Sequence, residues 1–219
     1  MKQTYLYFLI VLAIYPLLGC QKSSKPIAQL DNNSYITNFE LLQKYTSNDT
    51  RIRITSPKAT LDQTNNIIEI VESSIEIINK DGQDFKVKSG YSTINNMSNL
   101  INVFNNVKIS FIDNKDYYIT TNSFTWDLNT SIIDINSPLN MNLDNTKIVA
   151  TNGLYNLDLS KFKIANSVFN RNFFNSDGKK TYQVEIKSDL ANWLKNENSL
   201  EFKSNDKQVE TTINFLTTK

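Results

Sequence analysis

Phe85-Lys86-Val87-Lys88 opens the stretch that decides the fold, residues 85–141. An apolar residue alternates there with a charged one, which is typical of a β-strand with one buried face. The alternation returns in Leu100–Phe111, Tyr117–Trp126 and Ile132–Met141, and the polar segment Gly90–Asn99 separates the first two runs. The three-and-four spacing of an amphipathic helix does not persist in any window of the stretch. The stretch therefore predicts repeated antiparallel hairpins and an all-β chain.

The same pattern recurs along the chain with a period of about 30 residues, which lies in the range of stacked repeat units. In each copy a strand meets a Ser, Thr or Asn kink, a bulky apolar residue follows, and an Asn- or Asp-rich turn ends the unit. Asn replaces Gly at many of these turns because it tolerates left-handed backbone conformations better than most residues. The copies are Ile54…Leu61, Val87…Ile94, Ile119…Trp126, Val149…Leu154 and Ile186…Trp193.

Three segments are less regular than the repeat. Asp31–Tyr45 fits either a first strand or a short helix. Leu190–Leu194 fits a single helical turn, and Val209–Leu216 fits a closing or edge strand.

The N-terminus has the features of an export signal. Met1–Thr4 carries one positive charge, and Tyr5–Leu18 is an apolar run shorter than the roughly 20 residues of a membrane span. Leu17-Leu18-Gly19-Cys20 resembles the lipobox of bacterial lipoproteins, in which the cysteine is lipidated and becomes the new N-terminus. The alternative is an incidental cysteine behind an ordinary export signal. We expect a signal peptide over residues 1–19, a lipidated Cys20 with its tether over 20–45, and a periplasmic β domain over 46–219.

The composition argues against several classes of function. The formal net charge is +1 and only Arg51, Arg53 and Arg171 are arginines, so no basic face for nucleic acid is expected. Histidine is absent, which removes the commonest general base and the commonest metal ligand. A single cysteine permits neither an internal disulfide nor a thiolate metal cluster. We therefore expect no catalytic residue, no metal and no cofactor.

Ser56–Asp62, with the Ile-rich hairpin that follows it, resembles the LptC family, the membrane-anchored periplasmic component of the lipopolysaccharide export system. The segment is also similar to the related OstA-like/LptA bridge domains of that system. The copies at Lys88–Ile94, Thr121–Asp127 and Thr151–Leu157 carry the resemblance further, and it spans residues 51–187.

The resemblance implies a twisted, open β-jellyroll (a "β-taco") whose two half-sheets enclose an apolar groove for acyl chains. The partners that it implies are lipopolysaccharide or a related glycolipid, the inner-membrane ABC transporter subunits and the next periplasmic β-jellyroll bridge protein. Well-known members are anchored by a membrane-spanning helix, whereas this chain has the lipobox-like segment. The choice between inner and outer membrane therefore stays open, with the inner membrane favoured.

A groove of this kind needs an apolar lining, because each CH₂ exposed to water costs about 0.8 kcal/mol. The alternative is a closed sandwich in which the same side chains pack together as a core. The candidate lining residues are Ile54, Leu61, Ile68, Ile70, Ile75, Ile77, Phe85, Val87, Ile109, Phe111, Phe124, Trp126, Ile133, Ile135, Met141 and Leu154.

The last strand is a candidate partner edge. Glu210 is the only charged residue of Val209–Leu216, and exposed sheet edges are usually protected by charge or proline. Such a strand suits pairing with a strand of a partner. The alternative is a terminal strand buried in its own sheet. The edge candidates are Val209, Thr211, Ile213 and Phe215.

Two further functions compete with a lipid-conducting bridge subunit. One is a structural or adhesive lipoprotein with a closed β-sandwich and no lipid transport. The other is an enzyme such as a glycan hydrolase on a β-scaffold, which the absence of histidine and of a recognisable acid pair disfavours.

Overall fold

The computed structural model describes residues 33–44, 51–79, 82–112, 116–197, 199–205 and 208–215, and these residues confirm the predicted all-β fold. The predicted signal peptide, Cys20 and most of the tether lie outside the described residues. Among the residues described there is no helix with the length and hydrophobicity needed to cross a membrane. The strands are β1 (Asn33–Lys44), β2 (Arg51–Asp62), β3 (Ile67–Val71), β4 (Ser74–Asn79), β5 (Gly82–Lys88), β6 (Tyr91–Asn95), β7 (Leu100–Phe111), β8 (Tyr118–Asp127), β9 (Ile132–Ile135), β10 (Leu139–Leu143), β11 (Thr146–Ala150), β12 (Asn152–Asn156), β13 (Lys161–Phe174), β14 (Lys180–Leu194), β15 (Ser199–Lys203) and β16 (Glu210–Phe215).

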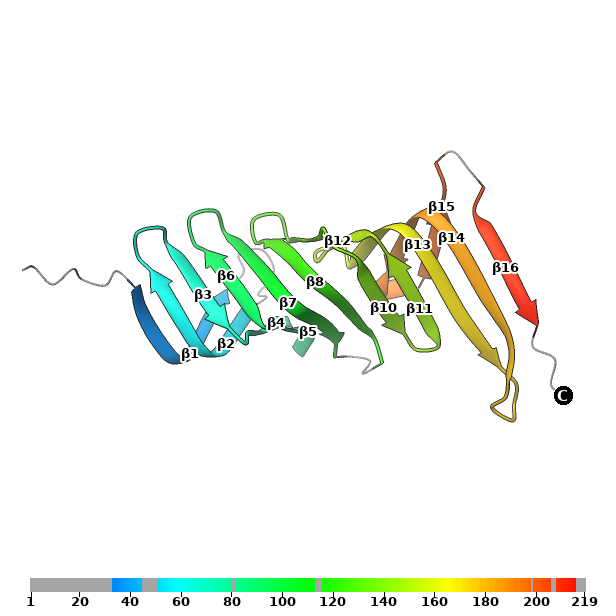
Figure 1. Ribbon diagram of the computed structural model, residues 1–219, viewed down its shortest axis with the longest axis horizontal. Coiled ribbons are helices and arrows are strands. Elements are labelled where there is room, and N and C mark those ends of the chain that lie inside the picture. The colour runs from blue at the N-terminus through cyan, green and yellow to red at the C-terminus, as the bar shows by residue number, and fades with distance from the viewer. Residues whose placement is uncertain are drawn as a thin grey trace, which may run out of the picture. The chain divides into compact units, whose positions relative to one another are not determined.

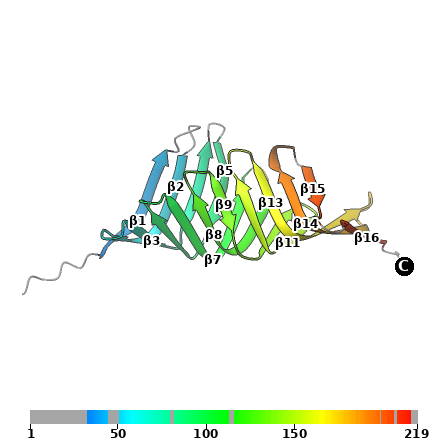
Figure 2. The same cartoon turned by 90° about the horizontal axis from the view of Figure 1, so that it is seen from above.

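The strands form one folded antiparallel sheet with two halves. The first half-sheet contains the short strands β3, β6, β9, β12 and β15, and the second contains β4, β5, β10, β11 and β16. The long strands β1, β2, β7, β8, β13 and β14 contribute one end to each half, so the halves are joined along a crease. In Figure 1, β3 and β6 lie in front of β4 and β5, whereas β10 and β11 lie in front of β15, so the half-sheet facing the viewer changes along the chain. The view from above separates the two layers, with β3 on one side and β5 on the other (Figure 2). This is the β-jellyroll architecture predicted from the sequence.

Three of the six long strands contain left-handed residues where they cross the crease. Asn38 in β1, Asn105 and Asn106 in β7, and Asn166 in β13 have positive φ angles of 53°, 64°, 55° and 47°. Asn adopts this left-handed region more readily than most residues with a side chain. In β13 the buried residues lie at even positions before Asn166, as at Ile164, and at odd positions after it, as at Phe169. The kink therefore changes which alternate residues point inward.

This change keeps one face of every strand inside. The pairs Ile54 and Leu61, Val87 and Ile94, Ile119 and Trp126, and Ile186 and Trp193 are each separated by seven positions. Strict alternation would place residues seven apart on opposite faces. In the structure both members of each pair point into the interior. Ile54, Val87, Ile119 and Ile186 do so from the second half-sheet, and their partners Leu61, Ile94, Trp126 and Trp193 do so from the first half-sheet. The predicted repeat is thus the crossing of the crease.

Buried hydroxyl groups satisfy one another along the crease. Ser73 Oγ lies 2.7 Å from Ser89 Oγ and 2.6 Å from Ser92 Oγ, and all three side chains are buried. Ser167 Oγ lies 2.9 Å from Ser188 Oγ where β13 and β14 cross together. Small side chains allow the backbones to bend there, and their mutual hydrogen bonds remove the penalty of burying a polar group.

Carboxylates hold the turns at the far ends of the first half-sheet. Asp62 Oδ1 accepts hydrogen bonds from the backbone N–H groups of Thr64 and Asn65, and the Asn65 side chain donates to its Oδ2. These hydrogen bonds, that of the Asn65 side chain first, lower the pKa of Asp62 below its usual value. The backbone N–H of Asn129 lowers the pKa of Asp127 in the same way. These aspartates stabilise turns of the Asx type.

The structure resolves one open alternative and corrects two details of the sequence analysis. Asp31–Tyr45 contains a strand, β1, and not a helix. Leu190–Leu194 is the end of β14, so the predicted helical turn there is wrong, and a 3₁₀ turn follows it at Lys195–Glu197. Gly90–Asn99 is more than a polar break because it contains β6. The two corrections have different causes: β14 loses simple alternation because it crosses the crease, whereas β6 alternates but has a largely polar sequence.

Candidate functional site

The interior between the half-sheets is the most extensive feature of the chain. On each half-sheet, residues directly opposite one another on successive strands form a continuous row, which is apolar except for Thr211 at the end of the second. We call these the first ladder and the second ladder after their half-sheets. The first ladder is Leu61–Ile68–Ile94–Ile101–Trp126–Ile133–Tyr155–Phe162–Trp193–Leu200. The second is Leu41–Ile54–Ile75–Val87–Ile109–Ile119–Met141–Ile148–Phe169–Ile186–Thr211.

The predicted lining residues fall on this interior, with one exception. Four of them lie in the first ladder and five in the second, and the adjoining inner rows carry six more. The first-ladder members are Leu61, Ile68, Trp126 and Ile133, the second-ladder members are Ile54, Ile75, Val87, Ile109 and Met141, and the others are Ile70, Ile77, Phe85, Phe111, Phe124 and Ile135.

Leu154 is the exception, and its predicted inward orientation is wrong. It pairs with Asp134 and Lys163 in a row on the outer face, while its neighbours Gly153 and Tyr155 are buried. Gly153 leaves room for the ring of Phe162, because a Cβ at position 153 would lie 2.6 Å from that ring. The bulky inward residue of β12 is therefore Tyr155.

Aromatic side chains close the edge of the interior opposite the crease, which we call the rim. Phe111 of the second half-sheet contacts Trp193 and Tyr155 of the first, with ring centroids 5.4 Å and 6.3 Å apart. Phe85 contacts Trp126 and Tyr155 in the same way, at 6.5 Å and 6.3 Å. All five side chains are at most 5% exposed. In this structure these five aromatic side chains therefore close the rim.

The apolar rows reach the surface at the C-terminal end of the sheet. Phe173, Tyr182 and Phe215 lie opposite one another on the inner faces of β13, β14 and β16. The rings of Phe173 and Tyr182 are stacked with centroids 4.5 Å apart, and Phe215 is 79% exposed. Ile213, one row nearer the crease, is 51% exposed. We call Phe173, Tyr182, Ile213 and Phe215 the apolar mouth.

The strands at both ends of the sheet have an unused edge among the described residues. β1 pairs with β2, and β15 and β16 each pair with β14 alone. The predicted edge candidates Thr211, Ile213 and Phe215 lie in β16, whereas Val209 precedes it. Each of the three has its side chain on the inner face, because Thr211 is the last residue of the second ladder.

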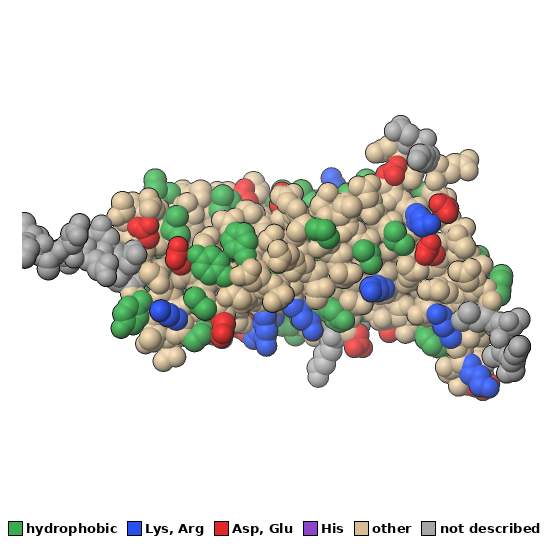
Figure 3. Space-filling view, in the orientation of Figure 1, with side chains coloured by type: hydrophobic (Ala, Val, Ile, Leu, Met, Phe, Trp, Pro, Cys, Tyr) green, Lys and Arg blue, Asp and Glu red, His purple; other side chains and the backbone are tan. Residues whose placement is uncertain are grey.

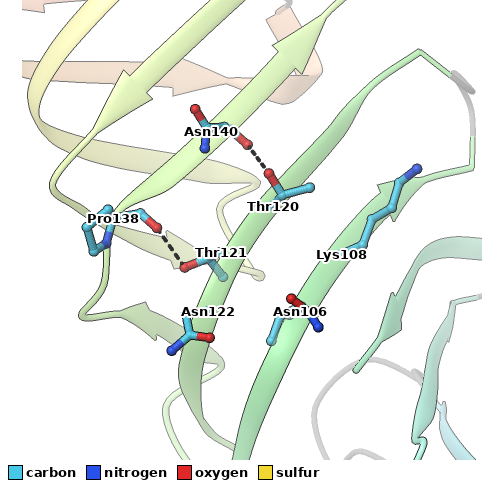
Figure 4. A pocket seen from close by; sticks show the side chains of 8 residues that line it. Asn106, Lys108, Thr120, Thr121, Asn122, Pro138 and Asn140 are labelled. Atoms are coloured by element: carbon cyan, nitrogen blue, oxygen red, sulfur yellow. Dashed lines mark hydrogen bonds between the residues drawn. The ribbon is translucent and has the colours of Figure 1, made fainter. Parts of the chain in front are cut away.

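The outer surface differs in character from the interior. The face seen in Figure 3 is largely uncharged, with basic, acidic and hydrophobic side chains scattered over it. A hollow of about 490 Å³ outside the crease shows this chemistry, with Lys108 and Asn122 among its lining residues. Thr121 Oγ1 donates to the carbonyl oxygen of Pro138 there, at 3.0 Å, and Thr120 Oγ1 donates to that of Asn140, at 3.5 Å (Figure 4). Most of the residues that line the hollow have polar side chains, with Val107 and Pro138 as the apolar ones.

Charged groups on the outer face act in ion pairs. Glu76 Oε1 accepts a hydrogen bond from Lys86 Nζ at 2.7 Å, and Glu76 Oε2 lies 3.9 Å from Arg53 Nη1. Arg53 Nε also lies 3.3 Å from Glu40 Oε1. Glu185 first, and then Glu210, raise the pKa of Lys187 above its usual value. Within the described part of the chain, no three His, Cys, Asp or Glu side chains are grouped to hold a metal ion. These ion pairs link residues of neighbouring strands.

Sequence reasoning missed several members of the two ladders. Except for Leu41, each omitted residue lies seven positions from another ladder member, which is the signal that identifies it. Tyr155 is seven positions after Ile148, whereas the predicted pair Val149 and Leu154 is five apart and lies on the outer face. The ladder residues absent from the predicted lining are Leu41, Ile94, Ile101, Ile119, Ile148, Tyr155, Phe162, Phe169, Ile186, Trp193 and Leu200. Of these, Ile94, Ile119, Ile186 and Trp193 were part of the predicted repeat.

The contrast between a closed rim and an open mouth can be measured with the same substitution at two sites. Phe111→Ala removes a ring that is 3% exposed and should lower the free energy of unfolding by about 3–5 kcal/mol. Phe215→Ala removes an exposed ring on the same inner face and should change it by no more than about 0.5 kcal/mol. Urea unfolding followed by tryptophan emission measures both, and equal effects would contradict the assignment of rim and mouth.

Comparison with known proteins agrees with this geometry. A search of curated proteins finds no match to the chain. A family profile described as "Lipopolysaccharide-assembly, LptC-related" matches residues 5–171, which is more than half of the chain. The match includes the N-terminal segment and β1–β12, together with the first part of β13. The chain therefore belongs to the LptC family, whose members are periplasmic, membrane-associated components of lipopolysaccharide transport.

Proposed function

We propose that this chain is a bridge subunit that carries the acyl chains of lipopolysaccharide between its two half-sheets. In this proposal it receives the lipid from the inner-membrane ABC transporter and passes it to the next periplasmic β-jellyroll. The observation that carries the proposal is the continuity of the two ladders, the first from β2 to β15 and the second from β1 to β16, together with the exposed side chains of the apolar mouth.

The energetics support an acyl chain as the occupant. Each CH₂ removed from water gains about 0.8 kcal/mol, so a chain of ordinary length needs an apolar path without gaps. The ladders provide such a path because each strand contributes an inward side chain in register with the next. For an acyl chain to enter, the two half-sheets must separate at the rim, because Phe85 and Phe111 contact the opposite half-sheet in this structure. An acyl chain would then replace these aromatic contacts with contacts of the same apolar kind.

A second function is supported by the same interior. The filled core, with Ile75, Val87 and Phe85 completely buried, is what a structural or adhesive lipoprotein with a closed sandwich would have. The two functions differ in whether lipid reaches these side chains while export is running.

Photo-crosslinking in living cells distinguishes the two functions. A crosslinking amino acid at Ile77 or Phe124, both on the inner face, should give an adduct with lipopolysaccharide while export is active. The same amino acid at Leu154 provides the matched control, because this apolar residue lies on the outer face. Adduct at Leu154 alone, or no adduct anywhere with export intact, would favour the closed sandwich.

We further propose that the partner β-jellyroll adds a strand to the free edge of β16. Main-chain hydrogen bonds along such an edge give affinity, and β16 carries only Glu210 as a charged side chain. The apolar mouth lies on the same strand, so a partner paired there would continue the ladders.

Two adjacent prolines test the edge. Neighbouring backbone N–H groups of a strand point to opposite sides, so Thr211→Pro and Thr212→Pro remove one bond to β14 and one bond to the partner. One substitution should lower the melting temperature, and the other should leave it unchanged but reduce co-purification with the next β-jellyroll protein at least tenfold. If neither proline reduced co-purification, the edge would not be the docking site.

Cys20 is the proposed anchor of the chain and lies outside the described residues. Lipidation would hold the domain at a membrane, with several acyl chains binding far better than one. Labelling of cells with an alkyne fatty acid should mark the wild-type chain, and Cys20→Ser should lose the label completely. Retention of label in Cys20→Ser would exclude this anchor.

A further inference from the structure

The two tryptophans of the chain have buried N–H groups with no hydrogen-bond partner. Trp126 and Trp193 are the only tryptophans, and each is 1% exposed. Nε1 of each indole is inaccessible to solvent and has no acceptor within hydrogen-bonding distance. Buried donors are almost always paired in native proteins, so two unpaired donors of the same type call for an explanation.

The surroundings of the two indoles are apolar. Trp126 lies between Ile101 and Ile133 in the first ladder, and the ring of Phe85 faces it from the second half-sheet. Trp193 lies between Phe162 and Leu200, and Phe111 faces it. An aliphatic or phenyl side chain would fill either position without leaving a donor unpaired.

Both indoles also lie at the rim rather than at the crease. Trp126 precedes Asp127, the last residue of β8, and Trp193 precedes Leu194, the last residue of β14. A lipid bound between the half-sheets would direct its hydrocarbon tails toward the crease and its head group out past the rim. The group at the boundary is the ester or amide that joins the tail to the head, and its carbonyl oxygen is a strong acceptor.

We propose that the indole N–H groups of Trp126 and Trp193 donate hydrogen bonds to the ester or amide carbonyl oxygens of the bound acyl lipid. This inference rests on the proposed function, because it requires a lipid between the half-sheets. It assigns the two tryptophans as the residues that distinguish acyl chains from simple hydrocarbon.

The spacing of the donors defines two separate positions. Four strand-to-strand steps separate Trp126 from Trp193 in the first ladder, through Ile133, Tyr155 and Phe162. At 4.7–4.9 Å a step, the two donors are about 19 Å apart along the sheet. One carbonyl group cannot reach both, so a moving lipid meets the first donor and then the second.

A matched pair of lipids tests the proposal on the full chain. The chain is placed in nanodiscs of ether-linked phosphatidylcholine, whose tails carry no carbonyl, and empty nanodiscs give the background. The probes are tetradecanoyl glycerol, which has an ester carbonyl, and tetradecyl glycerol ether, which lacks it. Wild type should bind the ester about three- to tenfold more tightly, the factor expected for a hydrogen bond between neutral groups.

Ultraviolet resonance Raman spectroscopy observes the donors directly, because the indole N–H band moves when a hydrogen bond forms. The ester should shift the band of the wild-type chain and the ether should not. Trp126→Phe and Trp193→Phe keep an aromatic ring without the donor, so each should retain half of the band shift. The double variant should bind the two lipids equally.

The outcomes separate the inference from the proposed function. Equal binding of ester and ether by the wild type, with an unshifted band, would overturn the inference and leave acyl-chain binding intact. Binding of neither lipid would overturn both. The wild-type spectra decide the matter without any variant, and the ether affinity of each variant shows whether its interior is still formed.

Discussion

A crossing of seven residues between the two half-sheets is the constraint on which the fold depends. In a regular strand, two residues separated by an odd number of positions point to opposite faces. For both to point inward, the alternation of inward and outward residues must shift by one position at the crease, so every long strand needs an irregularity there. The chain meets this need with left-handed asparagines such as Asn166 and with buried serines that hydrogen-bond one another. Without the phase change, Ile54 and Leu61 could not both face the interior, and one half-sheet would turn its apolar side to water.

The same constraint produces the property on which the proposed function rests. Because the crossing is repeated in register, the inward residues line up from strand to strand as continuous ladders. The half-sheets stay joined at the crease by the backbone of the long strands, while side chains such as Phe111 and Trp193 meet at the rim. An occupant that separates the rim therefore displaces aromatic contacts and leaves the strand pairing along the crease in place.

Local alternation was enough to predict the β class and the hairpin repeat, and all but one of the predicted lining residues face the interior. Where the two ends of a crossing were identified correctly, as for Ile119 and Trp126, both lie on the ladders. The errors at Leu154 and Leu190–Leu194 arose where the phase changes, because alternation on one side of a kink says nothing about the other. Contacts across the rim could not be predicted from the sequence, because Phe85 and Trp126 lie on different half-sheets and meet only after the sheet has folded.

A closed sandwich and a lipid carrier can have the same inward residues, so the polar atoms among them are the more informative ones. In a permanent core, an indole where phenylalanine would fit leaves a buried N–H without an acceptor, which costs free energy. Trp126 and Trp193 lie in such positions, at the rim and in apolar surroundings. At the C-terminal end the chain likewise leaves Phe215 and Ile213 uncovered by its described residues. Unpaired donors and an open end are both imperfections for a finished core, and both become useful once a lipid and a partner strand complete them.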